Sequence, residues 1–347
     1  MTLMPRWLLT ACLVAPALAL ASEPTWQLGA PVPEARTEGT ATTDGRLVYF
    51  LGGFIEGERD EHNRPPVGES MYAYDPASDR WTDLGPIPEG IHHTGLVHID
   101  GRIFQVGGYA RNTFDPTGAV RIYDIEAGQW SEGEPMPTPR GSIAIAVIDG
   151  LVHAIGGTVM DDDHAHEHDN PAAGDDPSVG THEVYDPATD SWSRRAPMPT
   201  PRNHHGAAVV DGRIHVLAGR VGDEFELTAH EIYDPATDSW SDGPALPTGR
   251  SGVAVVERQG RVYVFGGETF TDPARTFDEA EAFDPESGQW ERLPPMPTAR
   301  HGLGAAVIDD VIYVVSGGPD PGYAYSAANE RLVGSGGSRS KERARGP

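Results

Sequence analysis

The chain has 347 residues, of which 42 are Gly and 31 are Pro, and 38% are hydrophobic. This composition excludes a long-helix or transmembrane-bundle protein and favours many short strands joined by turns. The 52 acidic residues outnumber the 26 basic ones and give a formal charge of −26. Such a surface repels phosphates, so nucleic acid and anionic lipid are excluded as partners.

Residues 1–21 have the three parts of an export signal. Arg6 supplies a positive charge, Trp7 to Leu18 form an apolar stretch too short to span a bilayer, and Ala19-Leu20-Ala21 is a small-residue cleavage site. We therefore expect Ser22 to be the mature N-terminus and the protein to be periplasmic or secreted. No membrane insertion is expected after the signal is removed.

Leu9 to Cys12 also resembles a lipoprotein cleavage box, so lipidation of Cys12 stays open as an alternative. Cys12 is the single cysteine of the chain. Cleavage after residue 21 would leave a mature chain with no disulfide and no thiol chemistry.

Six copies of one pattern follow, with fixed spacings. Each copy holds a tryptophan: Trp26, Trp81, Trp130, Trp192, Trp240 and Trp290. Ten residues later five copies have an arginine: Arg36, Arg140, Arg202, Arg250 and Arg300. A small pair ending in Gly stands sixteen residues after each arginine, and an aromatic residue followed by Asp stands seven residues before five of the tryptophans. Such a repeat decides the architecture.

Each repeat is typical of a four-stranded antiparallel sheet. Alternating apolar residues from Ser142 to Ile148 end at Asp149-Gly150, a tight hairpin signal, and return from Leu151 to Ile155. A third strand around Glu183 to Tyr185 leads through an Asp-Pro turn into the strand of Trp192.

With its Gly pair, Tyr and Trp at a spacing of about fifty residues, the sequence resembles the kelch family. The resemblance covers roughly residues 24–333 and implies an all-β protein, a β-propeller with one blade per repeat. Four positions depart from the pattern: Ala218 and Ser316 replace the first Gly of the pair, Ile91 replaces the arginine, and Ile125 replaces the turn proline.

The ends of the repeat array predict how the ring closes. The first copy begins with a lone Trp26 strand, and the sixth has a third strand, Asn329 to Val333, but no Trp. The N-terminal strand should complete the last blade and so remove exposed sheet edges. We predict a single six-bladed propeller domain over residues 22–333 and a disordered Gly/Ser/Arg tail over 334–347.

Strand parity separates two faces of the ring. The tight Asp-Gly and Asp-Pro turns belong to one face, and the loops between second and third strands, with the connections between blades, belong to the other. The longest insertions, Phe54 to Ser70 and Thr158 to Thr181, lie on this second face, as do most of the histidines. We call it the loop-rich face and expect it to carry the function.

Two interpretations of the arginines stay open. In the first, they line a ligand pocket at the mouth of the ring and concentrate an anionic or polyhydroxylated ligand; the kelch resemblance implies that arginines at this position face the binding surface. That pocket would consist of Arg36, His92, Arg140, Arg202, His204, Arg250, Arg300 and His301. In the second, each arginine pairs within its blade with the glutamate two residues before the aromatic, such as Glu183, Glu231 or Glu281.

The insertion around residues 161–169 places His164, His166 and His168 next to carboxylates. Histidines at alternate positions beside acidic residues resemble a chelating tract for Zn or Cu. A solvated acidic loop is the alternative, because His-rich composition does not specify a site. No other cofactor is expected.

Two functions from different classes follow. One is a monomeric, non-catalytic module that binds a glycan, an anionic small molecule or a protein. The other is a carbohydrate-active enzyme, since kelch-like propellers include sugar oxidases and a six-bladed mutarotase/epimerase. The copper-radical oxidase is excluded, because its cofactor needs a Tyr–Cys crosslink and the mature chain has no Cys. Mutarotation needs a general acid and base; the sequence favours binding, since fold resemblance alone assigns no chemistry.

Overall fold

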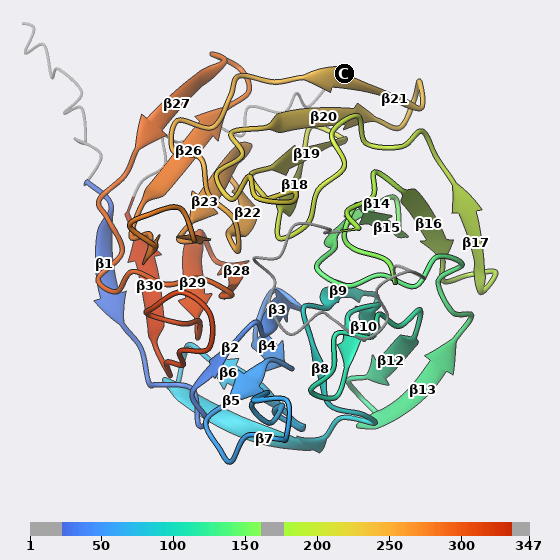
Figure 1. The fold of residues 1–347 in the computed structure, drawn as a ribbon, viewed down its shortest axis with the longest axis vertical. Helices are drawn as coiled ribbons and strands as arrows, with labels where there is room; N and C mark the ends of the chain where they lie inside the picture. Colours follow the sequence, from blue (N-terminus) through green and yellow to red (C-terminus); the bar gives the residue numbers. More distant parts are fainter. Residues whose placement is uncertain (1–22, 161–176, 335–347) are drawn as a thin grey trace, which may run out of the picture.

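The computed structural model describes residues 23–160 and 177–334 and forms a ring of six four-stranded antiparallel sheets, the blades (Figure 1). From the inner to the outer strand, blades 1 to 3 are β3(Thr40–Thr43)-β4(Val48–Leu51)-β6(Ser70–Asp75)-β7(Arg80–Pro86), β9(Gly95–Ile99)-β10(Arg102–Val106)-β12(Val120–Asp124)-β13(Gln129–Gly133) and β14(Ala144–Ile148)-β15(Leu151–Ile155)-β16(His182–Asp186)-β17(Ser191–Arg194). Blades 4 to 6 are β18(Gly206–Val210)-β19(Arg213–Leu217)-β20(His230–Asp234)-β21(Ser239–Asp242), β22(Ala254–Arg258)-β23(Arg261–Phe265)-β26(Ala280–Asp284)-β27(Gln289–Arg292) and β28(Gly304–Ile308)-β29(Val311–Val315)-β30(Asn329–Val333)-β1(Thr25–Leu28). The predicted all-β, six-bladed propeller is confirmed.

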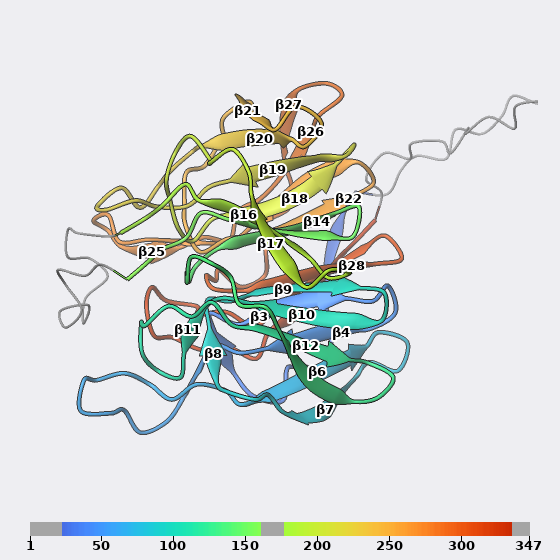
Figure 2. The same cartoon turned by 90° about the vertical axis from the view of Figure 1, so that its right-hand side faces the viewer.

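Three short ribbons add to the loop-rich face. They are β2(Arg36–Thr37) with β5(Phe54–Ile55), β8(Ile91–His92) with β11(Tyr109–Ala110), and β24(Glu268–Thr269) with β25(Arg275–Thr276). Figure 2 shows β11, β25 and the loop after β5 on the same side of the ring. The first two join the start of an inner strand to the loop that follows the second strand of the same blade. β24 and β25 pair with each other within one such loop, and a bridge from Glu268 to Ser251 ties that loop to the segment before β22.

The N-terminal strand completes the last blade, as the sequence predicts. Thr25 pairs with Val333 and Trp26 with Leu332 in antiparallel register. The Trp26 ring packs against Phe265 of blade 5, with ring centroids 5.8 Å apart, and its Nε1 donates to the carbonyl of Pro294 at 2.9 Å. The two ends of the ring are therefore held by a strand ladder and by aromatic packing.

The repeated aromatic pair fastens each blade to its neighbour. In blade 3, Tyr185 lies opposite Trp192 across β16 and β17, with ring centroids 5.2 Å apart. Trp192 Nε1 donates to the carbonyl of Glu134 in blade 2 at 2.8 Å, and the Tyr185 hydroxyl donates to Asp190 at 2.6 Å. Asp190 in turn accepts the N–H of Glu134 at 2.7 Å. The same three side chains make these bonds to the preceding blade in blades 1, 3 and 4.

Some predictions lie outside the described residues: the export signal over 1–21, the histidines His164, His166 and His168, and the tail after residue 334. Within residues 23–160 and 177–334 the chain has no helix of the length and apolarity needed to cross a bilayer.

Two blades carry the same buried histidine pair, which couples stability to pH. His153 Nδ1 lies 2.9 Å from His182 Nε2 in blade 3, and His215 Nδ1 lies 2.9 Å from His230 Nε2 in blade 4. Burial lowers the pKa of His153 and of His215 to about 4. An unfolded histidine titrates near 6.5, so the unfolded chain binds more protons below that pH. The stability contribution is complete above pH 6.5 and is lost as the pH falls towards 4.

We expect the free energy of unfolding to fall by up to about 2 kcal/mol per such histidine between pH 7 and pH 5. Urea denaturation at the two pH values measures it. His215→Gln should reduce the difference, whereas His62→Gln, which replaces a half-exposed histidine, should leave it unchanged. Equal pH dependence in the two variants would contradict the assignment to the buried pairs.

Candidate functional site

The repeat arginines lie inside the blades, so their predicted position at the mouth is wrong. All five have no exposed surface. Arg140 contacts Glu183 at 3.0 Å, Arg250 contacts Glu281 at 2.6 Å, and Arg202 pairs with Glu231 in the same way. Arg300 adds a fourth pair, with Glu330 at 2.6 Å. The within-blade interpretation is confirmed, because a desolvated guanidinium needs a carboxylate partner.

In blades 1 and 2 the buried arginine is also paired with a glutamate, but the glutamate comes from a different position of the repeat. Arg36 pairs with Glu34, two residues before it, at 2.7 Å. In blade 2, where Ile91 replaces the arginine, Arg121 stands at the position of the partner glutamate and pairs with Glu89 at 2.6 Å. In blade 2 the arginine thus stands where blades 3 to 6 have the glutamate, and the ion pair is kept.

The mouth is formed by the residue two positions after each repeat arginine or Ile91. We call these six residues the mouth ring: Glu38, His93, Ser142, His204, Gly252 and Gly302. All six have positive φ, between 51° and 67°. The N–H of each donates to the carbonyl of its counterpart in the neighbouring blade, at 2.8 to 3.3 Å, and the six bonds close a circle. Four non-glycine residues held in the left-handed region mark a position where function commonly accounts for the strain.

A cavity of about 200 Å³ runs from the mouth ring into the central channel. Its rim is polar, with Glu38, His93, Ser142 and His204, while Leu96 and other small or aliphatic side chains of the inner strands line its depth. Gly302 is required by a close approach: a Cβ there would lie 2.7 Å from the backbone nitrogen of Glu38.

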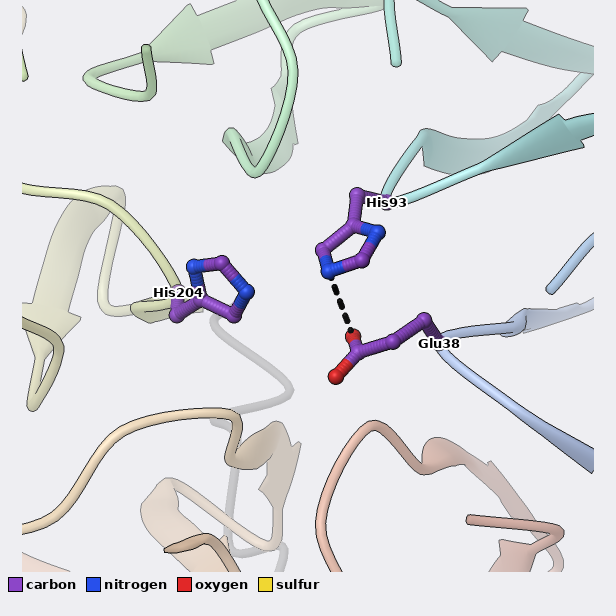
Figure 3. Close-up of side chains that lie close together, drawn as sticks. All are labelled: Glu38, His93 and His204. Carbon is purple, nitrogen blue, oxygen red and sulfur yellow. Dashed lines mark ion pairs between the residues drawn. The ribbon is translucent and has the colours of Figure 1, made fainter. Parts of the chain in front are cut away.

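Glu38, His93 and His204 come from three different blades and gather at the mouth (Figure 3). His92 Nε2 lies 2.7 Å from the carbonyl of Thr113, so it carries the proton. His92 Nδ1 therefore accepts from His93 Nδ1, at 2.6 Å. The lone pair on His93 Nε2 then faces Glu38 Oε2, at 3.3 Å.

A second set of contacts lies behind Glu38. His301 Nε2 is 3.5 Å from Glu38 Oε1 and 3.3 Å from Glu268 Oε2. Arg220 links this set to the mouth, since it donates to Glu268 Oε1 at 3.1 Å and to His204 Nε2 at 3.0 Å. Within residues 23–160 and 177–334, two groups of side chains have the composition of a metal site: Glu38, His93 and His204, and Glu38, Glu268 and His301.

Burial controls the protonation of this cluster. It raises the pKa of Glu38 to about 7, opposed by the attraction of His301 and assisted by the repulsion of Glu268. It lowers the pKa values of His93 and His204 well below the usual range, and that of His92 to about 3. The cluster therefore combines a carboxyl that holds its proton near neutral pH with neutral imidazoles.

Aromatic side chains lie beside His93, outside the residues that line the cavity. Phe114 lies 6.1 Å from the His93 ring and 5.3 Å from Tyr109, and Tyr323 packs edge-on to Phe54 at 5.1 Å. Phe114 and Tyr323 are partly exposed. We call Phe54, Phe114 and Tyr323 the aromatic wall.

Of the histidines predicted for the pocket, His204 lies on the rim. His92 and His301 are buried behind it, where they contact His93 and Glu38. Sequence reasoning missed Glu38 and His93. A signal was present: the position two after the arginine is Gly in two repeats, which indicates a positive φ, and polar in the other four.

The comparisons with known proteins agree with this architecture. The profile of the KLHDC2/KLHL20/DRC7 Kelch-repeats domain matches residues 175–318. The chain is 26% identical to Kelch-like protein 35 of Mus musculus over 151 residues, 44% of this chain and 23% of that protein. It is 25% identical to Kelch-like protein terF of Aspergillus terreus over 190 residues, 53% of this chain and 39% of that protein. These matches cover less than half the length of either relative.

Among solved structures, the one described as "Structure of YjhT" superposes with a TM-score of 0.72 at 15% identity, and covers 88% of this chain and 99% of that chain. This similarity concerns the fold. The kelch profile, the kelch-named relatives and the closed ring of six repeats agree. The chain is therefore a six-bladed β-propeller whose repeats are similar to kelch repeats.

Proposed function

We propose that this protein is an exported kelch propeller that binds a glycan at the mouth ring on the loop-rich face. A kelch-repeat propeller is typically a protein- or ligand-binding module. The observation that carries the proposal is the polar mouth ring beside the aromatic wall. Sugars offer hydroxyls to polar groups and apolar C–H faces to aromatic rings, and a site of this kind supplies both.

The size and charge of the site restrict the class of ligand that it can bind. The cavity of about 200 Å³ is smaller than the roughly 300–1,000 Å³ of drug-sized ligand sites, so it fits one sugar unit or the end of a glycan. The arginines that favoured an anionic ligand are buried and paired. Arg220 at the mouth is itself paired with Glu268. A neutral polyhydroxylated ligand therefore suits the mouth better than an anion.

A glycan array followed by calorimetry on the best ligand tests the proposal. Replacing Phe114 and Tyr323 together by Ala should weaken binding about tenfold or more, because two stacking contacts are lost. Leu28→Ala, at a strand that is exposed on the rim of the ring, is the control and should bind normally. Absence of glycan binding, or equal affinity of the two variants, would refute this function; capture of a protein through the same face would replace it.

Mutarotation is a second candidate, favoured by the position of one carboxyl group. Glu38 lies at the cavity between Nε2 of His93, at 3.3 Å, and Nε2 of His301, at 3.5 Å. A carboxyl between two imidazoles can give and take a proton at a sugar ring. Proton NMR of freshly dissolved sugars tests it: the protein should speed the approach to anomeric equilibrium and Glu38→Gln should abolish the effect. An unchanged rate of anomeric equilibration would refute mutarotation and leave glycan binding as the proposed function.

Export with cleavage of the signal predicts a defined N-terminus for the mature protein. If the signal over residues 1–21 is cleaved, intact-mass spectrometry of the exported protein should give a chain that begins at Ser22. Replacing Ala19 and Ala21 by Leu should block cleavage, because the enzyme that removes the signal needs small residues there. An intact Met1 or a lipid-modified Cys12 would show that the N-terminal segment is processed differently.

A further inference from the structure

Glu38 of the mouth ring and two side chains behind it converge from separate parts of the fold. Glu38 comes from blade 1, Glu268 from β24 beside blade 5, and His301 from the connection into blade 6. Their ligand atoms all lie within 4.8 Å of one another. The side chains are 12%, 3% and 1% exposed, respectively. Two carboxylates and an imidazole have thus been brought together in a site that excludes most water.

Two of the three ligand separations fit a tetrahedral metal ion. Zinc binds imidazole nitrogen at about 2.0–2.1 Å and carboxylate oxygen at about 2.0–2.2 Å, so adjacent ligand atoms of a tetrahedral site lie about 3.3–3.5 Å apart. His301 Nε2 lies 3.5 Å from Glu38 Oε1 and 3.3 Å from Glu268 Oε2. These lengths exceed those of good hydrogen bonds between charged groups. A neutral or singly protonated imidazole nitrogen can serve at most one of the two carboxylates, whereas an ion contacts both.

Outer partners hold each of these groups in place. His301 Nδ1 lies 3.1 Å from the carbonyl of Gly318 and donates to it. Nε2 then presents its lone pair, and it lies near the two carboxylates and 3.4 Å from the Thr37 hydroxyl. Glu268 accepts from the N–H of Gly322 at 3.1 Å and from Arg220 at 3.1 Å. A histidine whose second nitrogen donates to a backbone carbonyl is the usual arrangement of a metal ligand, because the bond fixes both the tautomer and the ring orientation.

We propose that Glu38, Glu268 and His301 bind one divalent transition-metal ion of the zinc class, reached through the cavity at the mouth. Mixed nitrogen and oxygen ligands in a four-coordinate geometry select such an ion over magnesium or calcium. His93 faces the other oxygen of Glu38 and so positions this ligand from the mouth side. The alternative group with His204 is less suited, because Arg220 donates to His204 Nε2.

We infer this metal site from contacts that do not rest on glycan binding, although Glu38 belongs both to the mouth ring and to the metal site. It differs also from the chelating tract expected at His164, His166 and His168, and the experiment must separate the two. The test uses the full mature chain with those three histidines replaced by Ser. After dialysis against zinc and then metal-free buffer, this background protein should retain one equivalent of zinc. Cobalt in its place should give the intense visible bands of a tetrahedral site.

Adding His301→Gln or Glu268→Gln to the background should weaken zinc affinity at least about 100-fold in calorimetry, since loss of even an outer partner costs 10- to 100-fold. His62→Gln, which removes an exposed histidine next to Glu61, is the matched control and should bind as the background does. Melting curves without metal establish that each variant is folded. If Glu268→Gln fails to fold because Arg220 loses its partner, Glu38→Gln replaces it.

A background protein that retains no zinc and gives no tetrahedral cobalt spectrum overturns the proposal, whatever the variants do. Zinc retained equally by the background and by His301→Gln overturns it as well. Failure of the glycan array leaves these readouts unaffected, so the two proposals are tested separately. A Glu38 carboxylate that binds a metal ion cannot also serve as a free acid. Mutarotation that proceeds with EDTA but stops when zinc is added would therefore show that metal binding and proton transfer by Glu38 exclude each other.

Discussion

Deleting residues 22–29 is expected to lower the free energy of unfolding by at least about 5 kcal/mol. The deletion removes β1, whose four residues pair with β30. It also removes Trp26, which packs on Phe265 and bonds to Pro294. Loss of a packed aromatic side chain alone costs about 3–5 kcal/mol, and the exposed edge of β30 adds the cost of unpaired backbone groups. Denaturant titration followed by tryptophan fluorescence and circular dichroism measures the loss.

Truncation after Gly334 is the matched control, because β30 ends at Val333 and all six blades keep their strands. It should change stability by less than about 1 kcal/mol. If the two truncations were equally stable, the N-terminal strand could not be what closes the ring.

Replacing Glu281 by Ala is expected to cost about 3–5 kcal/mol, because it leaves a buried guanidinium without its carboxylate. Glu281 is 1% exposed and receives Arg250 at 2.6 Å and the Thr248 hydroxyl at 2.9 Å. Without it Arg250 would keep only carbonyl partners, such as that of Gly266 at 2.6 Å. Burial already lowers the pKa of Arg250, and Glu281 is the main group that opposes this shift.

Two further variants make this test specific. Glu291→Ala removes a half-exposed partner of Arg261 and should cost no more than about 1 kcal/mol. Replacing Arg250 by Met and Glu281 by Leu together should cost less than Glu281→Ala alone, since an apolar pair leaves no charge unpaired. A small, similar loss for Glu281→Ala and Glu291→Ala would show that the buried pair is not needed.

The sequence could not decide whether the repeat arginines face a ligand or lie inside the blades. The spacing fixes where Arg140 or Arg250 stands on the chain, and both a mouth-lining and a blade-buried arginine satisfy it. The choice depends on which way the side chain points and on whether a carboxylate from another strand reaches it. Glu183 lies 43 residues from Arg140 along the chain, so only the assembled blade brings them together.

The sequence by itself determined the repeat, the number of blades and the closing strand, because these follow from local periodicity and from the strand that is missing at one end. The tertiary structure alone decided the site. Glu38, Glu268 and His301 belong to different blades, and their separations of 3.3 and 3.5 Å arise where six inner strands converge on one axis. This convergence depends on how the blades pack against one another, so it cannot be predicted from the spacing of residues within one repeat.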